Sequence, residues 1–385
     1  MRVADLLPPL GGLFEHLERV ITLDRARRYC FALADTPGPS GTIRFTRGRV
    51  LLDLLRGDDL LHGLRAHHDY LGSGNVALAT GDASTKPIWM VAHLDQCSYL
   101  IDRAEGARYR LVPSCYHMIR TGAVPALALD CADDPPRRLA RGSLETEANG
   151  EAVYFAPTEL AEPLRRGTRV VVEAAAHDLP EGCVTGVLDD AFGCAALALA
   201  AAAVAPYRPE ALFVFTDDEE GPVSTGNLTF ARGCARLVSR AATHLPRLAV
   251  VVDSHEAEDM ADGPAPRDLR PGDGACFGES ASRGRGGITP PRLYGFQREL
   301  SAFLAERGVR LRENADGYFS RSDCAPLSLA TPNVALVGYL LAHRHFDGVP
   351  RAHLADLIDL ARALAIYALV AQSSAWRCTY LGPED

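Results

Sequence analysis

Four apolar segments, rich in Val, Ile, Leu and Phe and without regular polar alternation, constrain the fold of this chain most strongly. They are KPIWMVAH, ALFVFTDDEE, RLAVVVD and PNVALVGYLLAHRH. Segments of this kind are typical of strands buried on both faces of a parallel sheet, with helices packed on each side. The sequence therefore predicts an α/β fold whose mixed, largely parallel sheet is flanked by helices.

Each of these segments ends in side chains that commonly bind metal ions. The residues are His93, Glu220, Asp253 and His345, and the acidic pair Asp189-Asp190 precedes an Ala-rich segment. In open α/β sheets, ligands bind beyond the carboxyl ends of the strands. We therefore expect these side chains to meet at one edge of the sheet.

Individually, these residues have simpler explanations. A single His after a strand is usually structural, and Glu219-Glu220 can be a solvated turn. Asp189-Asp190 can cap the Ala-rich helix that follows, because Asp is favoured at helix N-termini. Their joint occurrence favours a metal site, since imidazole nitrogen and carboxylate oxygen are ligands of zinc and its first-row neighbours.

A pair of metal ions about 3.5–4 Å apart can share a carboxylate and a water. Asp189 is the candidate for the shared carboxylate. His93 and Asp253 would then complete the first metal site. Glu220 and His345 would complete the second, so the predicted centre holds two divalent ions.

Two further acidic residues have candidate catalytic roles. Glu219, next to a predicted ligand, is free to take the proton from the bridging water as a general base. Asp95, two residues beyond His93, can hold the other imidazole nitrogen and thereby fix the tautomer of the ring.

Short motifs along the chain resemble those of one enzyme family. HLDQ, LDDAFG, DDEEG, VVD and RHFD occur in this order. They resemble the motifs of the dinuclear metallo-aminopeptidases of the tetrahedral aminopeptidase and glutamyl aminopeptidase group, which includes endoglucanase-like proteins. TPGPSG, LGSGNVAL, LRRGTRVVVEA and RSDCAPLSLATPNVAL also resemble segments of this family, so the resemblance covers nearly the whole chain.

The resemblance implies a metallo-aminopeptidase that removes N-terminal residues from short peptides. It implies two bound divalent ions, which are zinc or, as alternatives, cobalt or manganese. It also implies a homo-oligomer, either a dimer or a hollow dodecamer. It favours His345 over His343 as the last ligand. It also implies a cis peptide between Asp189 and Asp190.

Two positions depart from the family pattern, with Gln96 in place of a Glu and Ala191 in place of a basic residue. They leave the ligand set intact and the preferred substrate open. Two alternative functions stay open at this point. One is a related amide hydrolase of deacylase or carboxypeptidase type, and the other is a catalytically silent assembly protein of the same fold. A β-rich segment ahead of Asp189 favours the aminopeptidase, because carboxypeptidase-like relatives tend to carry an α/β lid after the acidic pair.

The sequence pattern changes between residues 103 and 180, where short segments typical of β-strands are separated by turns rich in Pro, Gly and Asp. This pattern predicts a small β-barrel-like domain, inserted between residues 1–102 and 181–385 of the catalytic α/β domain. We also expect helices over residues 13–34, 290–307 and 352–372. Arg283 or Arg285, in a Gly-rich loop, could meet a substrate carboxylate.

Composition narrows the class of partner. The formal net charge of -9 argues against a nucleic-acid surface. The longest apolar run, AFGCAALALAAAAVA, is too short to cross a bilayer. The ten cysteines, Cys97 among them, have no CxxC spacing, which favours free reduced thiols. We therefore expect a cytoplasmic protein with peptide substrates and no membrane or nucleic-acid partner.

Overall fold

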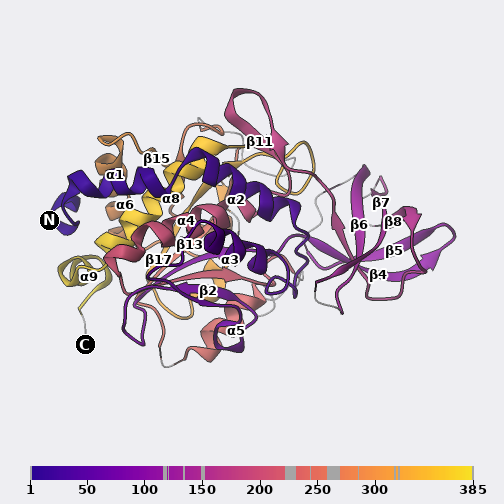
Figure 1. Cartoon of the computed structure of the whole chain (residues 1–385), viewed down its shortest axis with the longest axis horizontal. Helices are drawn as coiled ribbons and strands as arrows, with labels where there is room; N and C mark the ends of the chain where they lie inside the picture. The colour runs from indigo at the N-terminus through magenta and orange to yellow at the C-terminus, as the bar shows by residue number, and fades with distance from the viewer. Residues whose placement is uncertain are drawn as a thin grey trace.

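The computed structural model shows an α/β body with a β-barrel on one side (Figure 1). The residues that the structure describes are 2–115, 119, 121–132, 135–148, 152–221, 231–242, 244–257, 269–284, 286–315, 318–319 and 321–383.

The main sheet contains nine strands among the described residues. Their order is β1-β2-β12-β3-β13-β17-β14-β15, and β16 pairs with β13. The bounds are β1 Arg65–His67, β2 Val76–Ala79, β3 Ile88–His93, β12 Ala211–Thr216, β13 Leu248–Glu256, β14 Ala275–Gly278, β15 Leu311–Glu313, β16 Tyr318–Phe319 and β17 Val334–Leu341. The central strands β12, β3, β13 and β17 are mutually parallel. On one side β2 is antiparallel to β12 and to β1, and on the other β14 is antiparallel to β17 and parallel to β15.

The four apolar segments form these four central strands, which confirms the mixed, largely parallel sheet. Their ends differ in part from the prediction. Strand β3 ends at His93 as expected, but β12 ends at Thr216 and leaves Glu219-Glu220 in a loop. Strand β13 continues past Asp253 to Glu256, because its end pairs with β16 and β17.

Helices cover both faces of the sheet. Met90 and Ala92 of β3 face a core built with α1, α2, α3, α4, α6 and α8, whereas Trp89 and Val91 face a smaller core built with α5 and α7. The bounds are α1 Leu10–Val20, α2 Leu23–Asp35, α3 Arg47–Gly57, α4 Ala191–Val204, α5 Arg232–Arg240, α6 Pro291–Ala305, α7 Cys324–Leu327, α8 Leu354–Val370 and α9 Ser374–Leu381.

Helix α4 lies at the centre of the larger core. It is apolar all round and buried along its whole length, packed between the sheet, α2 and α8. The expected helices near 290–307 and 352–372 are present as α6 and α8. The expected single helix over 13–34 is two helices, because Thr22 interrupts it and caps α2 by accepting a hydrogen bond from Arg25 N.

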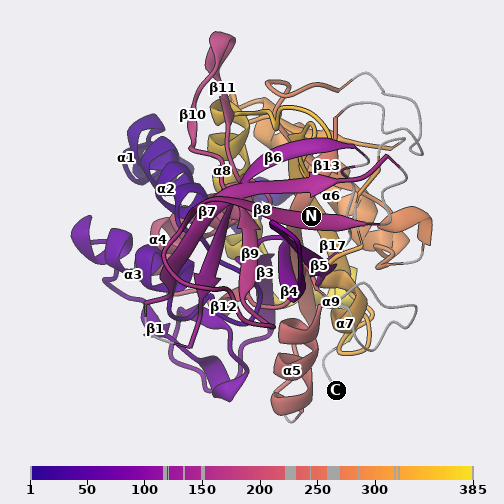
Figure 2. The ribbon, with the colours of Figure 1, turned by 90° about the vertical axis from the view of Figure 1, so that its right-hand side faces the viewer.

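The inserted β-barrel is confirmed. Its strands close in the order β4-β5-β8-β7-β6-β9. Their bounds are β4 Ser98–Glu105, β5 Arg108–Pro113, β6 Gly122–Asp130, β7 Arg137–Thr146, β8 Val153–Leu160 and β9 Arg169–Val172. Figure 2 shows the barrel strands from the side on which they project. Leu144, Phe155 and Val170 pack inside it, as expected for alternating inward positions of a small barrel.

A separate short sheet is formed by β10 His177–Asp178, β11 Cys183–Thr185 and β18 Ala352–His353, and β18 contacts β17 and α8. In the part of the chain that the structure describes, every helix is too short or too polar to cross a membrane.

Candidate metal centre

The predicted ligands come together at the carboxyl edge of the central strands. His93 ends β3 and Asp253 lies in β13, while Asp189 directly precedes the Asp190 cap of α4. Glu220 follows β12 and His345 follows β17. The four central strands are parallel, so loops far apart in sequence meet at this edge.

His93, Asp189 and Asp253 form the first ligand group. The Nε2 atom of His93 lies 3.4 Å from Asp189 Oδ1 and 3.9 Å from Asp253 Oδ1. One ligand atom from each of the three residues lies within 4.8 Å of the others. In a tetrahedral zinc site with bonds of about 2.0–2.1 Å, ligand atoms stand roughly 3.3 Å apart. The spacing of this group is therefore close to that of a metal-binding site.

The second ligand group uses the other oxygen of Asp189. His345 Nε2 lies 3.3 Å from Asp189 Oδ2 and 3.7 Å from Glu220 Oε1. Cys97, which is not among the predicted ligands, also belongs to this group. The two oxygens of Asp189 thus face different histidines, as a carboxylate shared between two ions would.

His343 is directed elsewhere. Its Nδ1 atom lies 3.3 Å from Asp347 Oδ1, and its side chain is 31% exposed, against 9% for His345. Its backbone has a positive φ of 53°. The structure therefore brings His345, and not His343, to the carboxylates of the second group.

The charges of the two groups fit divalent cations. Carboxylates buried at this density are costly unless positive charge compensates them. Burial raises the pKa of the Glu219 carboxyl well above its usual range, and the nearby His93 imidazole offsets this only in part. Burial opposes charge on His345, but Glu220 and Asp189 outweigh it and raise the pKa of its imidazole to about 10. The donor set therefore calls for extra positive charge at this point.

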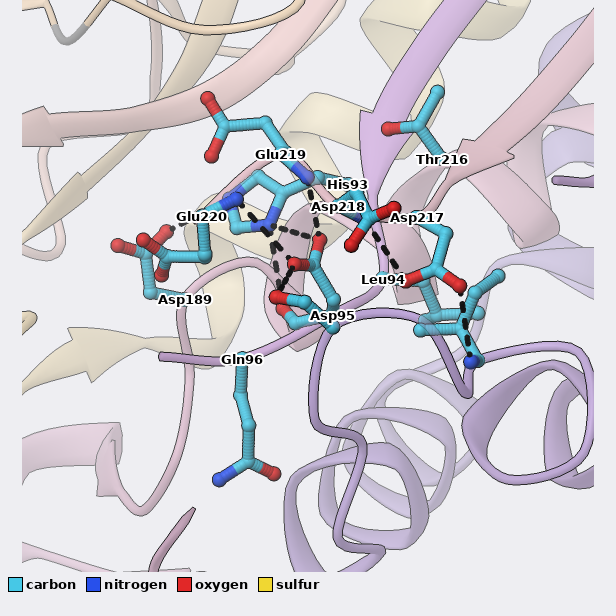
Figure 3. A network of polar contacts seen from close by, with 12 residues as sticks. His93, Leu94, Asp95, Gln96, Asp189, Thr216, Asp217, Asp218, Glu219 and Glu220 are labelled. Carbon is cyan, nitrogen blue, oxygen red and sulfur yellow. Dashed lines mark hydrogen bonds and ion pairs between the residues drawn. The ribbon is translucent and has the colours of Figure 1, made fainter. Parts of the chain in front are cut away.

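Asp95 supports the centre in two ways (Figure 3). Its Oδ1 faces His93 Nδ1 at 3.7 Å, while its backbone oxygen is closer, at 3.3 Å. Its carboxylate also accepts hydrogen bonds from the backbone N–H groups of Glu219 at 3.1 Å and Glu220 at 3.3 Å. Ser40 Oγ donates to it at 2.5 Å. Asp95 therefore positions the loop that carries Glu219 and Glu220 as well as facing His93.

Asp217 is a supporting residue that is not among the predicted site residues. Its carboxylate accepts hydrogen bonds from Gly41 N at 2.8 Å and Ile43 N at 3.4 Å, and its own N–H donates to Asn75 Oδ1 at 2.9 Å. The TPGPSG turn, the Asn75 segment and the acidic loop are thereby joined. The sequence could have indicated this role for Asp217, because the turn, the Asn75 segment and the acidic loop all lie in motifs that resemble those of the family.

Asp190 serves as the N-cap of α4, since its Oδ1 accepts a hydrogen bond from Gly193 N at 3.0 Å. The helix-cap interpretation thus holds for Asp190, while Asp189 faces the histidines. The peptide bond between the two is cis, as the resemblance implies.

A hollow that is partly open to solvent lies over the second ligand group. Asp189, Glu220 and His345 line it on the side of the main sheet, and Tyr99 and Val172 line it from the root of the barrel. Arg344 also lines it and forms an ion pair with Glu256 at 3.2 Å.

His255, two residues beyond Asp253 in β13, is fully buried, and its Nδ1 lies 3.0 Å from Asn314 Nδ2. Arg285 and the side chain of Arg283 lie outside the described residues, so their suggested contact with substrate stays a prediction.

Comparisons with solved structures identify the fold. A TET aminopeptidase from a marine-sediment thaumarchaeon matches with a TM-score of 0.69 and 15% identity over 91% of this chain and 99% of that chain. An aminopeptidase from the archaeon Desulfurococcus kamchatkensis matches with a TM-score of 0.67 and 16% identity over 90% of this chain and 94% of its own. The TET1 peptidase of Pyrococcus horikoshii matches with a TM-score of 0.65 and 16% identity over 90% and 99%.

No protein-family model matches the sequence, and no curated protein matches it. The likeness to the solved structures is therefore one of fold, which extends over nearly the whole chain. This is the fold of the family that the sequence motifs resemble.

Proposed function

We propose that this chain is a metal-dependent aminopeptidase that hydrolyses N-terminal residues from short peptides at a dinuclear metal centre. The observation that carries the proposal is the position of Asp189, whose two oxygens lie 3.4 Å from His93 and 3.3 Å from His345. The shared fold with TET aminopeptidases supports it.

In this proposal, His93 and Asp253 hold one divalent ion, Glu220 and His345 hold the other, and Asp189 is shared. Zinc is the proposed metal, with cobalt or manganese as alternatives, because all three accept carboxylate and imidazole ligands. When bound, the two ions would polarise the scissile carbonyl and acidify a water.

The remaining chemistry belongs to side chains of the protein. A Glu219 carboxylate oxygen accepts the proton of the attacking water and passes it to the amide nitrogen that leaves. Asp95 holds the backbone of Glu219 and Glu220, and its contact with Ser40 keeps this support in place. Correct placement of these groups before substrate arrives is what makes such catalysis effective.

The hollow beside the second ligand group is the proposed binding site for the end of the peptide. It is partly open to solvent, so the end of a peptide can approach Asp189, Glu220 and His345 from outside. Tyr99 and Val172 would give the substrate an apolar contact from the barrel side.

The state of assembly and the location are also proposals. The Pyrococcus horikoshii TET1 peptidase can assemble into a tetrahedron or a large octahedral shell. We propose a homo-oligomer for this chain, a dimer or a dodecamer, in the cytoplasm. Light scattering of the purified protein measures the assembly directly, and a monomer at all concentrations would contradict it.

The proposed activity is tested with aminoacyl chromogenic substrates after chelation and restoration of zinc, cobalt or manganese. We expect hydrolysis only after metal is restored, and only when the α-amine of the substrate is free. Matched substrates with an acetylated amine are the control. Release of acetate from the acetylated substrates would favour a deacylase instead, and no bound divalent ion would favour a silent assembly protein.

A further inference from the structure

Cys97 places a thiol in the second ligand group. Its Sγ, one carboxylate oxygen of Glu220 and one ring nitrogen of His345 all lie within 4.8 Å of one another. Cys97 also lines the hollow beside these two residues. The thiol is therefore within the cluster that would surround the second ion.

The backbone on both sides of Cys97 is fixed. On one side, Gln96 N donates to Gly38 O at 2.9 Å, and the Gln96 side chain accepts a hydrogen bond from Gly38 N at 2.9 Å. On the other side, Ser98 starts β4 and pairs with Val171 of β9. Cys97 is thus held at the junction of the α/β body and the barrel, so its side chain is presented to the ligand group by rigid neighbours.

The two ligand groups differ in the number and kind of donors. Within the described residues, the first group offers His93, Asp189 and Asp253, which are one nitrogen and two oxygen ligands. The second offers Glu220, His345 and the other oxygen of Asp189, together with the Cys97 sulfur. A catalytic zinc site typically has three protein ligands and an open position for water, whereas a fourth protein ligand closes the tetrahedron.

We propose that the Cys97 thiolate is a ligand of the second ion, which makes this half of the centre selective for zinc. The inference rests on the proposed function, because it takes the two ligand groups as a metal centre. On binding, the S–H bond breaks, the proton goes to solvent and the sulfur–metal bond forms. Thiolate is a soft ligand that favours zinc over manganese.

The experiment uses the full chain, loaded with cobalt under anaerobic conditions. A thiolate bound to cobalt gives sulfur-to-metal charge-transfer absorption in the near ultraviolet, which carboxylate and imidazole ligands do not give. We expect two cobalt ions per chain and this absorption in the wild type. We expect Cys97→Ser to bind cobalt without the absorption, and Cys97→Ala repeats the test with no side-chain donor.

Cys115→Ser is the matched control. Cys115 is a neighbouring buried thiol whose Sγ donates to Ser98 O at 3.5 Å, but it does not belong to the ligand group within the described residues. We expect this variant to keep the absorption. Loss of the absorption in Cys115→Ser but not in Cys97→Ser would overturn the proposal, because the sulfur ligand would then be Cys115.

A competition experiment that compares the affinities for zinc and manganese is a second test of the sulfur ligand. Removal of even an outer partner of a ligand costs about 10- to 100-fold in metal affinity, so loss of the sulfur ligand should weaken the second zinc at least about tenfold. Manganese affinity should change much less. Two bound cobalt ions without charge-transfer absorption in the wild type would overturn the sulfur ligand alone, whereas failure to bind any cobalt would overturn the metal centre itself.

Discussion

Substitution of Asp95 by Asn tests whether this carboxylate positions the acidic loop. Three donors point at it, the Ser40 hydroxyl and the backbone N–H groups of Glu219 and Glu220. Asn has the same shape but only one carbonyl oxygen, and its NH₂ group cannot accept a hydrogen bond. Glu219 N contacts Oδ1 while the other two donors contact Oδ2, so in either orientation of the amide at least one donor faces an NH₂ group.

A buried donor left without a partner costs about 1–3 kcal/mol. If this cost falls on the loop, the free energy of its local opening decreases by the same amount. Because about 1.36 kcal/mol corresponds to a factor of ten, the backbone amide protons of Glu219 and Glu220 should exchange roughly 5- to 150-fold faster in Asp95→Asn. Hydrogen exchange of the metal-free protein, followed by mass spectrometry on the peptide that contains both residues, measures this.

Asp356→Asn is the matched control. Asp356 is a buried carboxylate that accepts hydrogen bonds from Gly272 N at 2.7 Å and Gly274 N at 2.9 Å, apart from the metal centre. Its replacement should speed exchange near these glycines and leave the acidic loop unchanged. Unchanged exchange at Glu219 and Glu220 in Asp95→Asn would refute the positioning role.

Two further predictions concern catalysis and pH. Glu219→Gln should retain both metal ions, measured by elemental analysis, and lose about 10²- to 10⁴-fold in kcat, the usual contribution of a general base; a fully active variant would exclude that role. Burial raises the pKa of Asp356 to about 6, so between its ordinary value and this value the folded protein binds more protons than the unfolded chain. Stability should therefore fall as pH rises through this window, by at most about 3 kcal/mol from this group. Asp356→Asn should gain stability relative to the wild type over the same range in thermal unfolding, and a pH-independent difference between the two proteins would contradict the assignment.

The central strands could be predicted from sequence because a doubly buried strand must be apolar on both faces. The convergence of His93, Asp253 and His345 follows from the same sheet, since parallel strands bring their carboxyl ends to one edge. The roles assigned to these residues remain predictions. The division of the chain at residues 102 and 180 is likewise a proposal, although β4 already begins at Ser98.

The remaining features depend on contacts between segments distant in sequence. Strand β13 runs beyond Asp253 because β16 and β17 supply partners for its end. The bond from Ser40 to Asp95 joins residues 55 positions apart, and no local pattern encodes it. The sequence alone does not distinguish Cys97 from the other cysteines, because its neighbours in space, Glu220 and His345, become visible only in the folded chain.

The first and last strands of the barrel, β4 and β9, are neighbours, and Ser98 at the start of β4 pairs with Val171 near the end of β9. The two chain crossings between body and barrel therefore lie side by side. A short turn in place of the barrel could rejoin the body without rethreading any strand of the main sheet. In evolution, such a module can be lengthened, shortened or exchanged as a unit while the catalytic scaffold keeps its topology. Under the proposed function, a change of substrate range or assembly is accordingly easier to reach through the barrel than through the sheet that carries the proposed ligands.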